Sequence, residues 1–240
     1  MLNLLKSLIT SLLQIGLLLP LLFLIQFRYS KKQKRLLILA ALIILAECIA
    51  ASGFSFTLFP KQQWNWTGKT ASLIAAILFV YFNPVLSRKA IGFTSFKPFS
   101  DYSIWSVSGI TLLFRLFSKI NSGNFHWFSS FETFAFQATL PGFSEEIIYR
   151  GILLGIFNKV YPASVTVFKA RIGWGVLIVS VLFGLEHGIH IDKHWQMMFN
   201  SEKFCKTMGT GFIMAWLKQR SGSLLPAIGF HNLWNLIVFS

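Results

Sequence analysis

The strongest constraint on this chain is a set of ionisable side chains inside segments apolar enough to cross a bilayer. They fall in three short blocks: Glu145-Glu146-x-x-x-Arg150, Phe183-x-x-x-His187 and His231-x-x-x-Asn235. An ionisable side chain at membrane depth costs about 2.5–3.5 kcal/mol on insertion scales, so it is read first as functional. Only 8 of the 240 residues are Asp or Glu. Two adjacent carboxylates where ionisation is hardest therefore indicate a functional site.

The composition is that of a polytopic membrane protein. The chain is 54% hydrophobic and 12% charged, with a mean hydropathy of +0.61, whereas a soluble domain carries roughly 25% charged residues. About 20 apolar residues cross a bilayer core. The candidate spans are 2–27, 36–59, 71–86, 103–120, 129–157, 172–191, 204–217 and 222–240. They predict an all-α, polytopic transmembrane bundle of about eight helices, with residues 1–240 as one integral-membrane domain.

The net charge of +14 points to lipid rather than to nucleic acid. Most Lys and Arg residues lie in short loops between spans, where they face anionic head groups. The apolar run at the N-terminus is too long for a signal peptide, and it is followed by a basic cluster, so an uncleaved first helix is expected. We expect a multi-pass protein of a prokaryotic plasma membrane that contacts membrane lipid and no nucleic acid.

The three blocks are predicted to meet at one depth. Counted at 1.5 Å per residue from loops 158–171 and 218–222, the blocks lie about 16–24 Å into the membrane. If these loops share a face, the blocks form one polar pocket. Two pairs of glycines four residues apart, Gly151 with Gly155 and Gly184 with Gly188, permit close helix packing. Such packing would bring the glutamates of one helix to the histidine of the next.

The spacing within the blocks suggests separate roles for the two glutamates. Residues four apart share a helix face, so Glu146 is placed to neutralise Arg150 as a structural ion pair. That leaves Glu145 without an obvious cation, and a desolvated carboxylate is suited to act as a general base.

The histidine blocks would complete a site for amide hydrolysis. His187 can share a water molecule with Glu145, and His231 with Asn235 can donate hydrogen bonds to an oxyanion. The blocks contain no evident Ser or Cys nucleophile, so the attacking group would be water.

Simpler interpretations exist for each block. Taken singly, they could be a buried ion-pair staple, a hydrogen-bonded core histidine and a polar clamp between helices. Glu47 and Arg115 are interpreted as cavity or packing residues. His187, His190 and His194 share a face if their helix continues, and they could hold a divalent metal such as zinc. The helix is expected to end near residue 191, so the metal is a minority alternative and no cofactor is predicted.

The three blocks together resemble the CPBP family of CAAX proteases and bacteriocin-processing enzymes, also called the Abi or type II CAAX prenyl endopeptidase family. The matching stretches are SEEIIYRG, FGLEHG and HNLWN, in the family's order and spacing. The resemblance covers roughly 129–240, which would be the catalytic core. Tyr149 stands where the family usually has Phe.

The resemblance implies an intramembrane endopeptidase of a glutamate type, although such proteins are often labelled metalloproteases. Glu145 and His187 would activate the water, His231 and Asn235 would form the oxyanion site, and Glu146 with Arg150 would order the pocket. The substrate would be a CaaX-type prenylated protein or a small membrane peptide such as a bacteriocin. The alternatives are a non-proteolytic immunity or scaffold protein that keeps the fold and, third, a transporter.

Overall fold

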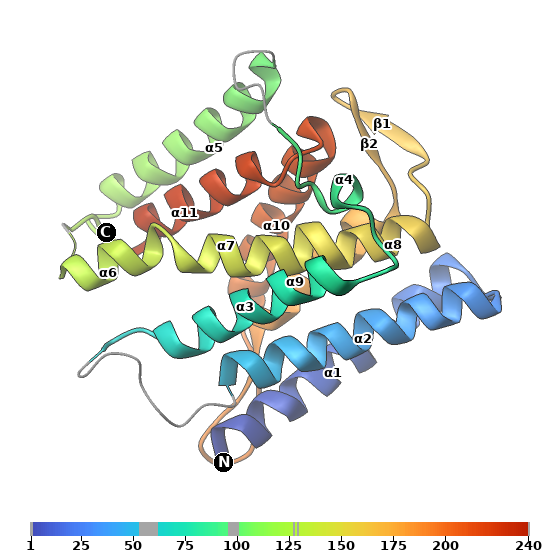
Figure 1. Ribbon diagram of the computed structural model, residues 1–240. Helices are drawn as coiled ribbons and strands as arrows, with labels where there is room; N and C mark the ends of the chain where they lie inside the picture. Colours follow the sequence, from blue (N-terminus) through green and yellow to red (C-terminus); the bar gives the residue numbers. More distant parts are fainter. Residues whose placement is uncertain (1, 53–61, 96–100, 127, 129, 240) are drawn as a thin grey trace.

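Apolar helices account for most of the chain in the computed structural model, which describes residues 2–52, 62–95, 101–126, 128 and 130–239 (Figure 1). The helices are α1 (Leu2–Ile25), α2 (Lys31–Ser52), α3 (Trp66–Phe82), α4 (Arg88–Ile91), α5 (Tyr102–Asn121), α6 (Phe131–Gln137), α7 (Leu140–Glu146), the π-helix η2 (Ile147–Leu153), α8 (Leu154–Val160), α9 (Trp174–Gly188), α10 (Ser201–Ser221) and α11 (Leu225–Phe239). The predicted all-α bundle is thereby confirmed.

Each predicted span coincides with helix, but several boundaries differ. The span 129–157 is divided into α6 and a continuous rod of α7, η2 and α8, with the break just before Pro141. Helix α10 is longer than the predicted 204–217, and the last part of span 36–59 lies outside the described residues. Among those described, α1 and α2 are long and apolar enough to cross a membrane, while α3, α9 and α11 are shorter apolar helices. The number of crossings stays a prediction.

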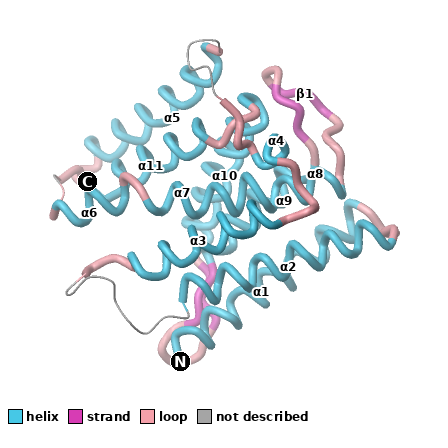
Figure 2. The backbone as a smooth tube through the Cα atoms, in the orientation of Figure 1, coloured by secondary structure: helices cyan, strands magenta, loops and turns pink. Residues whose placement is uncertain are grey.

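Two short antiparallel hairpins were not predicted (Figure 2). Strands β1 (Val165–Val167) and β2 (Ala170–Ile172) follow α8, and β3 (Ile189–Ile191) and β4 (Met197–Phe199) follow α9. The second hairpin corrects one boundary: α9 ends at Gly188, where the carbonyl oxygen accepts from Asn200 N at 2.8 Å, rather than near residue 191.

The outer helices present apolar side chains to their surroundings. Leu12 and Leu17 on α1, Ile38 and Leu42 on α2, and Phe114 on α5 are all at least half exposed. Contiguous exposed apolar surface of this extent is unusual in a soluble monomer. It suits contact with lipid chains, and the protein is an integral membrane protein.

The rod of α7, η2 and α8 lies at the centre of the bundle and contacts both α3 and α9 (Figure 1). Its residues Leu153, Leu154 and Ile156 are completely buried, as are Val176 and Ile178 of α9. The first block lies where α7 passes into η2. Because π-helical turns often occur at functional sites, this position supports a functional reading of the block.

The glycine pairs permit close packing, but not between the helices expected. A Cβ on Gly184 would lie 2.9 Å from Cβ of Met208, so the Gly184 and Gly188 pair packs α9 against α10. A Cβ on Gly151 would lie 2.9 Å from Cγ2 of Ile91, on α4. The expectation that these pairs join the glutamate helix to the histidine helix is therefore wrong.

The bundle has a basic end, where loops 26–30, 83–92, 161–173 and 222–224 meet (Figure 1). Tyr29 and Tyr161 are joined there by a hydrogen bond of 2.6 Å between their hydroxyls, and Gln219 Nε2 donates to Arg171 O at 3.0 Å. Loops 158–171 and 218–222 thus share a face, as the depth argument required. The opposite end holds both described chain ends and the start of α3 (Figure 1).

Candidate active site

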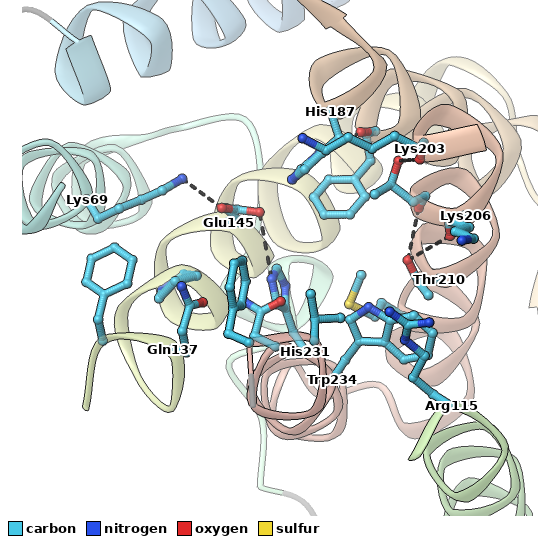
Figure 3. A pocket seen from close by; sticks show the side chains of 18 of the residues that line it. Lys69, Arg115, Gln137, Glu145, His187, Lys203, Lys206, Thr210, His231 and Trp234 are labelled. Atoms are coloured by element: carbon cyan, nitrogen blue, oxygen red, sulfur yellow. Dashed lines mark hydrogen bonds and ion pairs between the residues drawn. The ribbon is translucent and has the colours of Figure 1, made fainter. Parts of the chain in front are cut away.

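The predicted site residues Glu145, His187, His231 and Asn235 all line one cavity of about 580 Å³ (Figure 3). Glu145 lies in the last turn of α7, His187 lies in the last turn of α9, and His231 and Asn235 lie one turn apart on α11. The convergence predicted from depth is therefore confirmed. The side chains that line the cavity come from α3, α5, α6, α7, α9, α10 and α11.

Glu146 and Arg150 lie behind the cavity wall and form the predicted pair. Arg150 Nη1 donates to Glu146 Oε1 at 2.9 Å, and both side chains are fully buried. Arg150 also donates to the carbonyl oxygen of Gly211 at 3.3 Å, and its guanidinium lies 4.2 Å from the ring centroid of Phe183. A Cβ on Gly211 would lie 3.0 Å from Arg150 Nη2, so the glycine on α10 makes room for the arginine.

The same carboxylate oxygen holds His231. Nδ1 of His231 lies 2.7 Å from Glu146 Oε1. An ionised carboxylate can only accept, so Nδ1 carries the hydrogen and Nε2 is the ring atom left for the cavity. Glu146 therefore fixes the orientation of His231 as well as neutralising Arg150, a role that spacing within one helix did not reveal.

His187 is oriented by its own helix. Its Nδ1 lies 2.9 Å from the carbonyl oxygen of Phe183, one turn earlier on α9. Because a carbonyl oxygen only accepts, Nδ1 is the donor and Nε2 of a neutral ring is an acceptor. His187 can thus take a hydrogen from a water molecule in the cavity.

Glu145 has a cation that the sequence argument did not find. Lys69 Nζ, from the first turn of α3, lies 2.7 Å from Glu145 Oε1. The expectation of an unpaired Glu145 is therefore wrong. The other oxygen, Oε2, is buried without a hydrogen-bond partner among the described residues, and it lies 3.8 Å from His231 Nε2.

Asn232 is a second polar residue that the sequence argument missed. Its Oδ1 accepts from the backbone nitrogen of Gly142 at 3.0 Å, in a buried hydrogen bond between α11 and the start of α7. A Cβ on Gly142 would lie 2.1 Å from that oxygen. The contact fixes the helix of the glutamates against the helix of His231.

The alternative histidine cluster is not assembled. Because α9 ends at Gly188, His190 lies in β3 and His194 in the following turn, and both are exposed and off the helix face of His187. Within the described ranges, no group of three His, Cys, Asp or Glu residues is placed to hold a metal ion.

Two further acidic residues lie on the other side of Lys69. Ser72 Oγ donates to Glu47 Oε1 at 3.3 Å, and the carboxyl groups of Glu47 and Glu186 are close enough to interact with each other and with Lys69. Glu47 is accordingly part of a polar cluster that continues from the cavity between α2, α3 and α9.

One side of the cavity is basic and aromatic. Arg115 lies 5.6 Å from the ring of Trp234, and its buried Nε has no hydrogen-bond partner in the described part of the chain. Lys203 and Lys206, from the first turns of α10, line the same side. Arg115 is therefore a cavity residue, as was expected of it.

Carboxylates, histidines and an amide surround one cavity in a bundle of membrane helices. These groups are suited to hydrolysis within the membrane. Residues 126–237 match the family described as type II CAAX prenyl endopeptidase Rce1-like. This match covers most of the C-terminal half of the chain and agrees with the resemblance carried by the three blocks. The match supports a CAAX-type intramembrane protease that acts on a peptide or protein. No curated protein and no solved structure matches the chain.

Proposed function

We propose that this protein is an intramembrane endopeptidase in which Glu145 and His187 activate a water molecule. The observation that carries the proposal is the orientation of two acceptors. Glu145 Oε2 is buried with no hydrogen-bond partner among the described residues, and His187 Nδ1 is held by Phe183, so Nε2 is the ring nitrogen left for a water molecule. Both residues line the same cavity. A water between them would be polarised toward attack, which is general base catalysis.

The reaction then proceeds without a covalent enzyme intermediate. The water oxygen attacks the carbonyl carbon of the scissile bond while one proton passes to Glu145 Oε2 and the other hydrogen is held by His187 Nε2. The carbonyl electrons move onto oxygen. When the tetrahedral intermediate collapses, the C–N bond breaks and Glu145 returns its proton to the leaving amine.

His231 and Asn235 stabilise the oxyanion. The Asn235 amide is a donor in any state, whereas His231 Nε2 donates only when the ring is doubly protonated, because Nδ1 already gives its hydrogen to Glu146. Glu146 holds Nδ1, so Nε2 is the ring atom that faces the cavity. Glu146 and Arg150 thus act behind the wall, by orienting His231.

The substrate is a peptide segment presented from the membrane, either the end of a CaaX-type prenylated protein or a small membrane peptide such as a bacteriocin. The cavity supports this range because its wall combines Phe136, Phe183 and Trp234 with the cationic Arg115 and Lys203. An apolar chain and an anionic terminus can be accommodated side by side.

The test is cleavage of a membrane-peptide library, with and without prenylated members, by the purified protein in lipid. Glu145→Gln keeps the size of the side chain and removes its basicity, so it is expected to abolish cleavage while the protein still folds. Near-normal turnover in that variant would overturn the assignment of Glu145. If wild-type protein cleaves nothing while a cellular phenotype survives Glu145→Gln, the alternative of a non-proteolytic immunity or scaffold protein is favoured.

A further inference from the structure

Lys69 is the one charged residue of α3, and it reaches the site from outside the three blocks. Its Nζ approaches one oxygen of Glu145 to 2.7 Å, while the side chains of the pair are only 18% and 9% exposed. Figure 3 shows Lys69 pointing across the cavity to Glu145, with His231 on the far side of that carboxylate. The lysine therefore meets Glu145 on the side opposite the histidine.

The backbone that carries Lys69 is fixed on both sides. Asn65 caps α3 by accepting from Gly68 N at 2.9 Å and donates to Ala51 O at 2.8 Å, which ties α3 to the end of α2. Glu132 Oε1 accepts from Trp64 N at 3.2 Å and from Trp66 Nε1 at 3.1 Å, which ties the same turn to α6. The ammonium group of Lys69 therefore reaches Glu145 from a helix turn whose backbone is held in place.

The two oxygens of Glu145 differ because of this contact. Oε1 is occupied by Lys69, whereas Oε2 lies free of hydrogen-bond partners among the described residues and near His231 Nε2. Without a cation on one side, rotation of the carboxylate would leave no preferred oxygen facing the cavity. A correctly oriented catalytic group contributes strongly to rate, and a misplacement of 1 Å can cost about 100-fold.

We propose that Lys69 is a positioning residue: it binds Oε1 of Glu145, keeps the carboxylate ionised and turns Oε2 toward the water. This inference rests on the proposed role of Glu145 and extends it to a residue of the N-terminal half, outside the matched range 126–237. Lys69 does not touch the reacting atoms. Its cost in a membrane segment is offset by the ion pair with Glu145.

The first measurement is cleavage by Lys69→Ala, Lys69→Arg and the control Lys159→Met, with the full-length protein in lipid. Lys159 donates to a backbone carbonyl outside the cavity, so its variant controls for the loss of a helix lysine. Lys69→Ala is expected to lower kcat about 100-fold with little change in KM. Lys69→Arg should recover most of that loss, and added methylammonium should partly restore Lys69→Ala.

A purely structural ion pair predicts a different pattern. Lys69→Ala would then lose thermal stability and kcat together, and methylammonium would not restore turnover. Wild-type kcat in a folded Lys69→Ala variant would also overturn the proposal. Should Lys69→Ala fail to fold, Lys69→Gln keeps a hydrogen-bond donor without the charge and tests the same point.

The second measurement needs no substrate. A hydrophobic carbodiimide reacts with protonated carboxyl groups, and mass spectrometry locates the adduct. Glu145 is expected to be labelled several-fold faster in Lys69→Ala than in wild type or Lys69→Arg. Equal labelling in all three would refute the inference about Lys69 whatever the protein cleaves, whereas faster labelling with an active Glu145→Gln variant would refute only the proposed function.

Discussion

The buried pair of Glu146 and Arg150 offers the sharpest energetic test. The variants are Arg150→Met, Glu146→Leu and the double substitution, which replace the charges by apolar groups of similar length. Removing one partner of a buried pair costs about 3–5 kcal/mol because the other charge is left uncompensated. Both side chains are 0% exposed, so solvent cannot relieve that cost.

The structure also predicts which single variant is worse. Glu146 Oε1 accepts from Arg150 and from His231, so Glu146→Leu strips a partner from two side chains. Arg150→Met leaves Glu146 still bound to His231. We therefore expect Glu146→Leu near the upper limit of about 5 kcal/mol and Arg150→Met near the lower limit of about 3 kcal/mol.

The assay is reversible unfolding in mixed micelles, followed by circular dichroism and tryptophan fluorescence. The double variant should cost less than the sum of the single variants, with a coupling of about 0.5–3 kcal/mol. Glu202→Leu is the matched control, because Lys206 and Glu202 form an exposed pair at the same spacing and no measurable loss is expected. If the losses of unfolding free energy in the single variants simply add, Glu146 and Arg150 do not interact. A larger loss in Arg150→Met than in Glu146→Leu would show that Glu146 Oε1 is not shared by Arg150 and His231.

Three further predictions concern packing, metal and topology. Gly142→Ala should cost about 1–3 kcal/mol of stability, because its Cβ would lie 2.1 Å from Asn232 Oδ1. Adding Asn232→Ala should relieve part of that loss, and unchanged stability in Gly142→Ala would contradict the contact. Proteolysis should survive chelation and dialysis, and a stoichiometric zinc lost in step with activity would make His187 a ligand instead. If eight helices cross the membrane with the N-terminus outside, the basic end faces the cytoplasm. In a background without native cysteines, Ser122→Cys should then react with an impermeant reagent from outside intact cells while Ser164→Cys should not, and labelling of Ser164→Cys would overturn this model.

The blocks of the C-terminal half could be interpreted from sequence because ionisable residues stand out in apolar segments and helix spacing places Glu146 beside Arg150. Their similar depth, counted from loops on one face, then predicted that the blocks meet across three helices. The contact between Lys69 and Glu145 could not be predicted, for a physical reason. Lys69 lies just after Trp64 and Trp66 at a helix start, which is the usual composition of an interfacial anchor, and no local spacing relates α3 to α7.

Which helices contact each other was the feature least accessible from the sequence. The spacing of Gly184 and Gly188 does indicate close approach, yet nothing in it distinguishes α10 from the glutamate helix as the partner. The hairpins have strands of three residues, too short for a periodic pattern to indicate them. Asn232 was passed over because an amide beside His231 has no signature of the backbone nitrogen that it binds.

The π-helix between Glu146 and Leu154 has a consequence for how this rod can vary. In an α-helix each residue advances the direction of the side chains by about 100°, so an inserted or deleted residue turns one half of a helix away from its partners. A wider π turn takes up an extra residue and leaves both halves facing as before. The stretch Ile147–Leu153 can therefore absorb a change in length. A chain that lacked one residue there could form a regular α-helix and still present Glu145 to Lys69 of α3 and Gly155 to Leu86. A change of one residue in this stretch therefore need not rotate the side chains on either side of it. Relatives that differ in length here can keep the same cavity geometry.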